Sequence, residues 1–216
     1  MRARGFVDFA IGALALLLAS LPAYAAAAPV RILALGTSLS AGYGLGPGEG
    51  FIDQLGQALK RAGYDVAIEN AGVSGDTSAG GLARLDWALA GNPAIVIVEL
   101  GGNDALRGLP PQETERNLDQ ILAKLDARKT PALLMGMLAP PNLGKDYGDE
   151  FNAIFPRLAK KHGASLYPFV LDGVAANPSL NQADGIHPNA AGAKLMAERI
   201  LPTIVPLVKA AEAKAP

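Results

Sequence analysis

The amino-acid sequence predicts an α/β protein with three α/β/α layers, in which helices cover both faces of a five-stranded parallel sheet. Two observations predict this fold class. Five short apolar runs are typical of strands that are buried on both faces, and a helix-compatible stretch follows each of them. We expect the flavodoxin-like strand order 2-1-3-4-5, with the strand order of a Rossmann fold as the alternative.

The five strand signals differ in strength, and the third is the strongest. Residues 94–100 (AIVIVEL) combine β-branched side chains with an almost unbroken apolar run. The first run stops at Gly36, where the chain can turn out of the sheet. The strands are expected at 30–35, 64–69, 94–100, 132–138 and 165–169.

The helices are indicated by apolar spacing and by start and stop signals. Ser78 or Thr77 is available as the N-cap of the second helix, and Pro202 and Pro206 are expected to interrupt or end the last one. The helices are expected at 50–62, 78–89, 111–127, 150–161 and from 190 to about 208. In the third of them four apolar residues share one face, namely Leu118, Ile121, Leu122 and Leu125.

The first residues have the layout of a secretory signal peptide. Arg2 and Arg4 precede an apolar run over 11–21, and Ala23-Tyr24-Ala25 fits a small-x-small cleavage pattern. The run is shorter than the roughly 20 residues of a membrane-spanning helix. We therefore expect a periplasmic or secreted protein without a membrane span after processing. A retained N-terminal anchor is the alternative.

These signals divide the chain into three parts. Residues 1–25 form the signal peptide, with cleavage between residues 25 and 28. Residues 29–208 are expected to form one domain, because they contain all five strands and helices and no linker. Residues 209–216 are expected to be a frayed tail.

Composition excludes several classes of function. A formal net charge of -1 gives no electrostatic footprint for nucleic acid. The absence of cysteine excludes a thiol nucleophile, disulfides and thiolate zinc sites. With only two histidines, His162 and His187, a His-rich metal site is not expected. The oligomeric state has no signature in the sequence.

Polar residues concentrate in the loops that follow the strands, where ligand sites of parallel sheets form. Ser38 follows the first strand, Gly75 lies after the second, and Asn103 lies in the Gly-Gly-Asn-Asp motif after the third. Taken alone, each has an ordinary reading, because serine caps helices and glycine-rich loops turn. An asparagine amide can also stabilise an oxygen that becomes negative during acyl transfer.

Asp184 and His187 lie three residues apart on a turn before the last helix. The carboxylate can accept a hydrogen bond from one ring nitrogen and leave the other to face Ser38. Pro188 restricts the backbone of His187 to extended geometry, which helps to hold the ring. His162 follows two lysines at an expected helix C-terminus, so we assign it a structural role.

The order of these motifs resembles the SGNH (GDSL-type) hydrolases, which are named for Ser, Gly, Asn and His in separate blocks. The matching positions are Ser38, Gly75, Asn103 and His187, with Asp184 three residues before the histidine. The flanking residues are similar to the bacterial periplasmic arylesterase, acyl-thioesterase I and lysophospholipase subgroup. The resemblance implies hydrolysis of a small-molecule acyl ester or thioester by Ser38, His187 and Asp184, without metal or cofactor. It also implies an oxyanion hole from the Ser38 N–H, the Gly75 N–H and the Asn103 side chain.

One position departs from the family pattern. The usual Gly-Asp-Ser-Leu block reads Gly36-Thr37-Ser38-Leu39 here. The family's aspartate is not the acid of the triad, so Thr37 need not abolish catalysis. Its hydroxyl can accept a local backbone N–H. The exchange removes a negative charge beside the nucleophile, and a lower rate or an altered pH dependence is a possible consequence.

The sequence also suggests residues for an acyl pocket and leaves two alternative functions. Leu109, Pro141, Leu143 and Ile186 are expected to line an apolar groove. A nucleotide-binding protein is one alternative, but the glycines at 42–48 do not have the G-x-G-x-x-G spacing. A catalytically silent periplasmic binding module on the same fold is the other.

Overall fold

The computed structural model describes residues 28–214, and the expected signal peptide at 1–25 lies outside them. Within the described range one five-stranded sheet forms, in the order β2-β1-β3-β4-β5, and every neighbouring pair is parallel. The strands are β1 (Val30–Gly36), β2 (Val66–Gly72), β3 (Ile95–Val98), β4 (Ala132–Met135) and β5 (Ser165–Tyr167). The expected flavodoxin-like order is confirmed.

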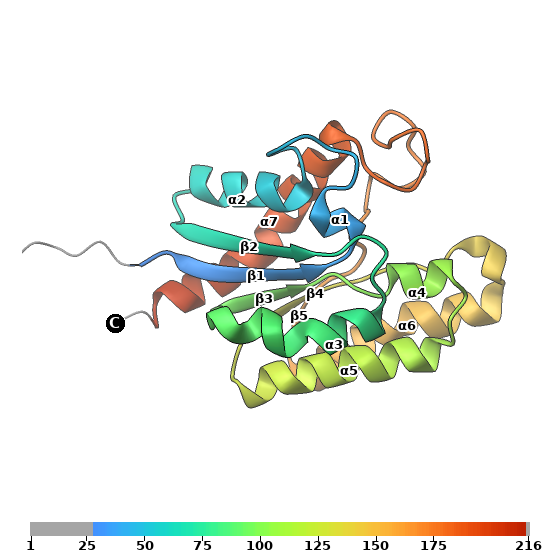
Figure 1. Ribbon diagram of the computed structural model, residues 1–216, viewed down its shortest axis with the longest axis horizontal. Coiled ribbons are helices and arrows are strands. Elements are labelled where there is room, and N and C mark those ends of the chain that lie inside the picture. Colours follow the sequence, from blue (N-terminus) through green and yellow to red (C-terminus); the bar gives the residue numbers. More distant parts are fainter. Residues whose placement is uncertain (1–27, 215–216) are drawn as a thin grey trace, which may run out of the picture.

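Helices cover both faces of the sheet (Figure 1). One face carries α2 (Phe51–Arg61) and α7 (Ala190–Glu212), which pack on each other. The other face carries α3 (Ser78–Ala88), α5 (Pro111–Ala127) and α6 (Lys145–His162). Short helical turns complete the described chain: α1 (Ser38–Ala41), η1 (Leu89–Gly91), α4 (Gly102–Leu106) and η2 (Pro141–Leu143).

The core forms where the helices pack on the two faces of the sheet. Every residue of β3 and β4 is buried, as expected for strands covered on both sides. The predicted apolar face of α5 is confirmed, because Leu118, Ile121, Leu122 and Leu125 are all buried. The predicted N-cap of α3 is Thr77, whose side chain accepts a hydrogen bond from the N–H of Gly80.

Several boundaries differ from the sequence prediction: β2 begins at Val66, and β3, β4 and β5 end earlier than expected. β2 extends to Gly72, since its last three residues pair with Ala34, Leu35 and Gly36 of β1. α6 begins at Lys145 instead of residue 150.

The prediction that Pro202 and Pro206 would interrupt or end the last helix is wrong, because α7 continues through both to Glu212. Both prolines are exposed, so the carbonyls that lose their hydrogen bonds can be solvated. The opposite face carries Ile204 and Val208, which are buried and hold the helix on the sheet. The expected frayed tail over 209–216 is therefore helical up to residue 212.

Candidate active site

The carboxyl ends of all five strands lie at one edge of the sheet (Figure 1). At this edge β1 ends at Gly36 and the chain turns directly into α1, whose first residue is Ser38. Thr37 is the N-cap of α1, and its hydroxyl accepts from the N–H of Leu39 at 3.5 Å. The expected local acceptor role of Thr37 is thus present. Gly42 ends the four-residue helix with a φ of 72°, a left-handed conformation that suits glycine.

The structure brings Ser38, His187 and Asp184 together. The Oγ of Ser38 lies 2.9 Å from Nε2 of His187, and Nδ1 of the same ring lies 2.7 Å from Oδ2 of Asp184. Asp184 accepts only if Nδ1 carries the proton, which leaves Nε2 as an acceptor for the serine hydroxyl. The three side chains therefore form a continuous hydrogen-bonded chain.

Asp184 is held in its charged form by the turn that it begins. Its Oδ1 accepts from the backbone N–H of His187 at 3.0 Å and from that of Ile186 at 2.9 Å. The backbone N–H of His187, its ring and the N–H of Ile186 lower the pKa of Asp184 to about 2. The carboxylate is consequently ionised throughout the pH range in which a neutral histidine can act as a base.

Gln182 and Tyr43 support the imidazole, and the sequence analysis identified neither. The side-chain amide of Gln182 donates to the carbonyls of Tyr43 at 2.7 Å and of Pro188 at 2.9 Å. The ring of Tyr43 lies 4.6 Å from that of His187, centroid to centroid, with a tilt of 39°. Gln182 therefore connects the segment after α1 with the turn that carries His187.

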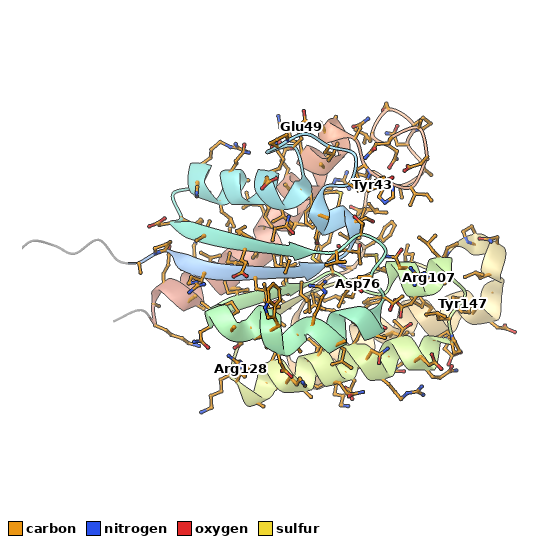
Figure 2. All side chains as sticks on the ribbon, in the orientation of Figure 1. Tyr43, Glu49, Asp76, Arg107, Arg128 and Tyr147 are labelled. Atoms are coloured by element: carbon orange, nitrogen blue, oxygen red, sulfur yellow. The ribbon has the colours of Figure 1, made fainter. Side chains whose placement is uncertain are left out.

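The loops after β2 and β3 place Gly75 and Asn103 at the same edge of the sheet. Gly75 has a φ of 82°, which favours glycine, and its carbonyl accepts from Arg107 at 2.7 Å. The amide of Asn103 donates to the carbonyl of Asp76 at 2.8 Å, which uses one of its two hydrogens. Figure 2 shows Asp76 and Arg107 at this edge of the molecule.

Arg84 connects the loop of Gly75 to the first two strands. Its Nε forms an ion pair of 2.7 Å with Asp76, and its two terminal nitrogens donate to the carbonyls of Ala71 at 2.6 Å and Gly36 at 2.8 Å. The guanidinium therefore fixes the ends of β1 and β2 relative to the loop. Two of its three partners are backbone carbonyls, which every residue has, so these contacts cannot be recognised from the sequence.

The four residues expected to line an acyl groove fall on two sides of the site. Leu109, Pro141 and Leu143 come from segments after β3 and β4 that approach each other: a Cβ placed on Gly108 would lie 3.9 Å from the Leu143 side chain. The carbonyl of Leu109 also accepts from the hydroxyl of Tyr147 at 2.8 Å. Ile186 instead lies beside His187 and is 48% exposed.

A small recess adjoins Ser38 and His187. Its volume is about 10 Å³, and Tyr43, Phe51 and Met196 are among the residues that line it. It can hold about one water molecule and is too small for an acyl chain. None of the four expected groove residues lines this recess.

His162 ends α6, at the opposite edge of the sheet from Ser38, since β5 begins directly after it. Its Nε2 lies 2.7 Å from Asp119 and its Nδ1 2.5 Å from Asp126, both on α5. Burial lowers the pKa of His162, but the hydrogen bonds that its ring makes to these two carboxylates outweigh that effect and raise it. The contacts support the structural role expected for this residue.

Residues 28–214 contain neither a candidate metal site nor a candidate membrane span. Three or more His, Cys, Asp or Glu side chains do not gather there in a way that could hold a metal ion. No helix in that range combines the length and apolar character needed to cross a membrane.

Comparison with known proteins identifies the family. The model of the GDSL-like Lipase/Acylhydrolase family matches residues 34–195. Esterase TesA of Pseudomonas aeruginosa is 42% identical over 183 residues, which cover 84% of this chain and 91% of the relative. Thioesterase 1/protease 1/lysophospholipase L1 of Escherichia coli (strain K12) is 41% identical over 186 residues, covering 86% and 88%.

Solved structures of similar sequence agree with this match. The crystal structure of TesA superposes with a TM-score of 0.78 at 42% identity, covering 82% of this chain and 99% of that one. AlinE4, described as an SGNH-hydrolase family esterase, superposes with a TM-score of 0.71 at 47% identity, covering 87% and 98%. With the hydrogen-bonded serine, histidine and aspartate at the sheet edge, these matches show that the chain belongs to the GDSL-like lipase/acylhydrolase family and is a carboxylic ester hydrolase.

Proposed function

We propose that Ser38 is the nucleophile of this ester hydrolase, that His187 is its general base, and that Asp184 orients and stabilises the base. The observation that carries the proposal is the hydrogen-bonded chain of 2.9 Å from Ser38 to His187 and 2.7 Å from His187 to Asp184. A serine hydroxyl is barely ionised at neutral pH, and an adjacent imidazole removes its proton as it attacks.

The reaction has two halves that use the same residues. Ser38 Oγ attacks the acyl carbonyl while Nε2 of His187 takes its proton. The imidazolium then protonates the leaving alcohol or thiol as the bond to it breaks, and an acyl-enzyme forms. Water, deprotonated by His187, attacks that ester and releases the acid, and the proton returns to Ser38. The charge of Asp184 stabilises the imidazolium in both halves.

The oxyanion that forms in each half needs donors beside Ser38. We assign this role to the N–H groups of Ser38 and Gly75 and to the side chain of Asn103. Ser38 is the first residue of α1, so its N–H has no acceptor within the helix. The hydrogen bond from Asn103 to the Asp76 carbonyl orients the amide and leaves its second hydrogen for the oxyanion.

An acyl ester or thioester of a small molecule is the substrate class that the surface favours. Six large apolar side chains are more exposed than expected within the described residues, and five of them belong to segments at the carboxyl edge of the sheet. These five are Tyr43, Val73, Leu106, Leu138 and Ile186. Exposed apolar groups on the edge of the sheet that carries Ser38 favour an apolar substrate. We propose that an acyl chain also contacts Leu109, Pro141 and Leu143.

The direct test replaces Ser38 by Ala and measures hydrolysis of a nitrophenyl acyl ester. We expect loss of turnover and of labelling by a fluorophosphonate probe, because both need the Ser38 hydroxyl. Ser165→Ala, a serine on β5 outside the site, is the matched control and should retain both. Unchanged turnover in Ser38→Ala would refute the assignment. Nitrophenyl esters of increasing chain length then define the acyl preference.

We further propose that the protein is exported and acts in the periplasm or outside the cell. The arginines, the apolar run and the Ala-Tyr-Ala motif before residue 26 support this. The mass of the protein recovered from cells tests it: processing between residues 25 and 28 is expected, and an intact N-terminus in all fractions would contradict it.

A further inference from the structure

Glu99 is a fully buried acid that the proposed reaction does not use. It follows the last residue of β3, and its backbone N–H continues the pairing with β1 by donating to the carbonyl of Leu35 at 2.9 Å. Its side chain has an exposed fraction of 0%. Burying a carboxyl group is costly unless hydrogen-bond donors satisfy it, so the donors around Glu99 show what this side chain holds in place.

All the donors to Glu99 come from the turn that carries Ser38. Oε2 accepts from the backbone N–H of Thr37 at 2.9 Å and from that of Ser40 at 3.2 Å. The Ser40 hydroxyl donates to the same oxygen at 2.8 Å, and the Thr37 hydroxyl lies 2.9 Å from Oε1. Burial raises the pKa of Glu99 above its ordinary value, and these four donors lower it by less than burial raises it. The two residues that hold the carboxyl enclose Ser38 in the sequence.

The packing around this carboxyl leaves the turn little freedom. A Cβ placed on Gly36 would lie 2.0 Å from the Ser40 hydroxyl and 2.7 Å from Oε2 of Glu99. Neither distance is sterically possible, so only glycine permits the turn to approach the acid this closely. The short α1 is thereby fixed to β3, the strand beside β1.

Thr37 leaves Glu99 as the single acid beneath the turn of Ser38. An aspartate at this position, as in the usual family block, would place a second carboxyl against Glu99, and two like charges at such a distance cannot both ionise readily. The Thr37 hydroxyl can donate instead. In this chain the acid beneath the nucleophile therefore has a neutral hydrogen-bonding partner at residue 37.

We infer that Glu99 is the positioning residue of the nucleophile turn: through Thr37 and Ser40 it aims the Oγ of Ser38 at Nε2 of His187. This inference rests on the proposed function, because it assigns Glu99 a role in the attack by Ser38. Glu99 does not contact the reacting atoms, and it acts by fixing the backbone on both sides of the serine.

The test compares Glu99→Gln, which keeps the shape and one accepting oxygen, with Glu99→Ala, which removes both. We expect kcat for a nitrophenyl ester and the rate of fluorophosphonate labelling to fall together in Glu99→Ala, on the order of ten- to a hundred-fold. Glu99→Gln should lie between this variant and the wild type, since it keeps one of the two oxygens that accept from Thr37 and Ser40. KM should stay within about two-fold, because only the attack is impaired.

Ile121→Val is the control for lost stability, because it shortens a buried side chain of α5 and leaves the nucleophile turn untouched. Its Tm should fall while kcat and labelling stay at wild-type values. If Glu99→Ala fails to fold, Glu99→Gln decides: a lower kcat at constant KM supports the inference, and a wild-type kcat overturns it. Wild-type labelling with unchanged kinetics in folded Glu99→Ala overturns the inference alone. A wild type that the probe does not label overturns the proposed function, and this inference with it.

Discussion

Asp184→Asn removes the charge of Asp184 but can keep the hydrogen bonds that its side chain accepts from the backbone of the turn. An asparagine can keep the oxygen that accepts from the N–H groups of Ile186 and His187, so the turn should survive. Its amide nitrogen then replaces Oδ2, which lies 2.7 Å from Nδ1 of His187. Because an amide nitrogen only donates, Nδ1 becomes an acceptor and the ring proton moves to Nε2. The nitrogen facing Ser38 then holds a hydrogen and cannot take the proton of the serine.

The expected loss follows from this change of tautomer. We expect kcat to fall by about four orders of magnitude, the scale seen when the same exchange is made in a serine protease triad, with Tm and KM close to wild-type values. The assay is steady-state hydrolysis of a nitrophenyl ester, together with thermal unfolding. Asp184→Ala serves as the comparison, since it loses the turn contacts as well and should also lower Tm. A kcat in Asp184→Asn within about ten-fold of the wild type would refute the role of the carboxylate.

Three further predictions concern the oxyanion donors, the support of the site and the pH dependence of stability. Asn103→Ala should lower kcat about a hundred- to a thousand-fold with little change in KM, as measured by steady-state kinetics. Arg84→Lys cannot reproduce three hydrogen bonds from one planar group, and should lower the unfolding free energy in urea by about 1–3 kcal/mol. The raised pKa of His162 means that its pairing with Asp119 and Asp126 contributes fully below about pH 6.5, the unfolded value. This contribution is lost as pH rises through the folded pKa, so Tm should fall there in the wild type and less in His162→Gln.

The fold was predictable because its signals are local and agree with one another. The apolar face of α5 and the β-branched run of β3 each identify one element, and the alternation of elements then specifies a parallel sheet. The errors arose where tertiary contacts decide. Asn70 looks like a loop residue, yet its backbone pairs with Ala34 and its side chain donates to the carbonyl of Ser40.

The continuity of α7 is a second case in which tertiary packing, and not the local sequence, decides the structure. Proline inside a helix normally costs about 3 kcal/mol, and sequence reasoning applies that cost wherever proline occurs. Here Pro202 and Pro206 share the exposed face, while Ile204 and Val208 on the buried face keep the helix on the sheet. Which face a proline occupies depends on the packing and cannot be read from the residue type.

The positions of Ser38, Asp184 and His187 could be predicted because each follows a recognisable local signal. The residues that hold them could not, since Gln182 and Arg84 act largely through backbone carbonyls. Glu99 did leave a signal in the sequence, as the one acid in the apolar run over 94–100. A buried acid needs hydrogen-bond partners, but only the structure shows that the turn of Ser38 supplies them.

The length of α1 explains why Ser38 needs so many external contacts to hold its position. A four-residue helix contains about one turn and has little stability of its own, so neighbouring segments must fix the direction of Ser38. Glu99, at the end of β3, accepts hydrogen bonds from this turn, and the side chain of Asn70 on β2 donates one to it. Gln182, which precedes the turn of His187, donates to the carbonyl of Tyr43 in the segment after α1. These hydrogen bonds act on α1 and the segment after it, and not on the apolar core. Removing one of them should therefore reduce the rate of acylation more than the stability of the fold. The orientation of the Ser38 side chain is therefore set by residues at the carboxyl edge of the sheet, which lie in the strands and loops beside β1.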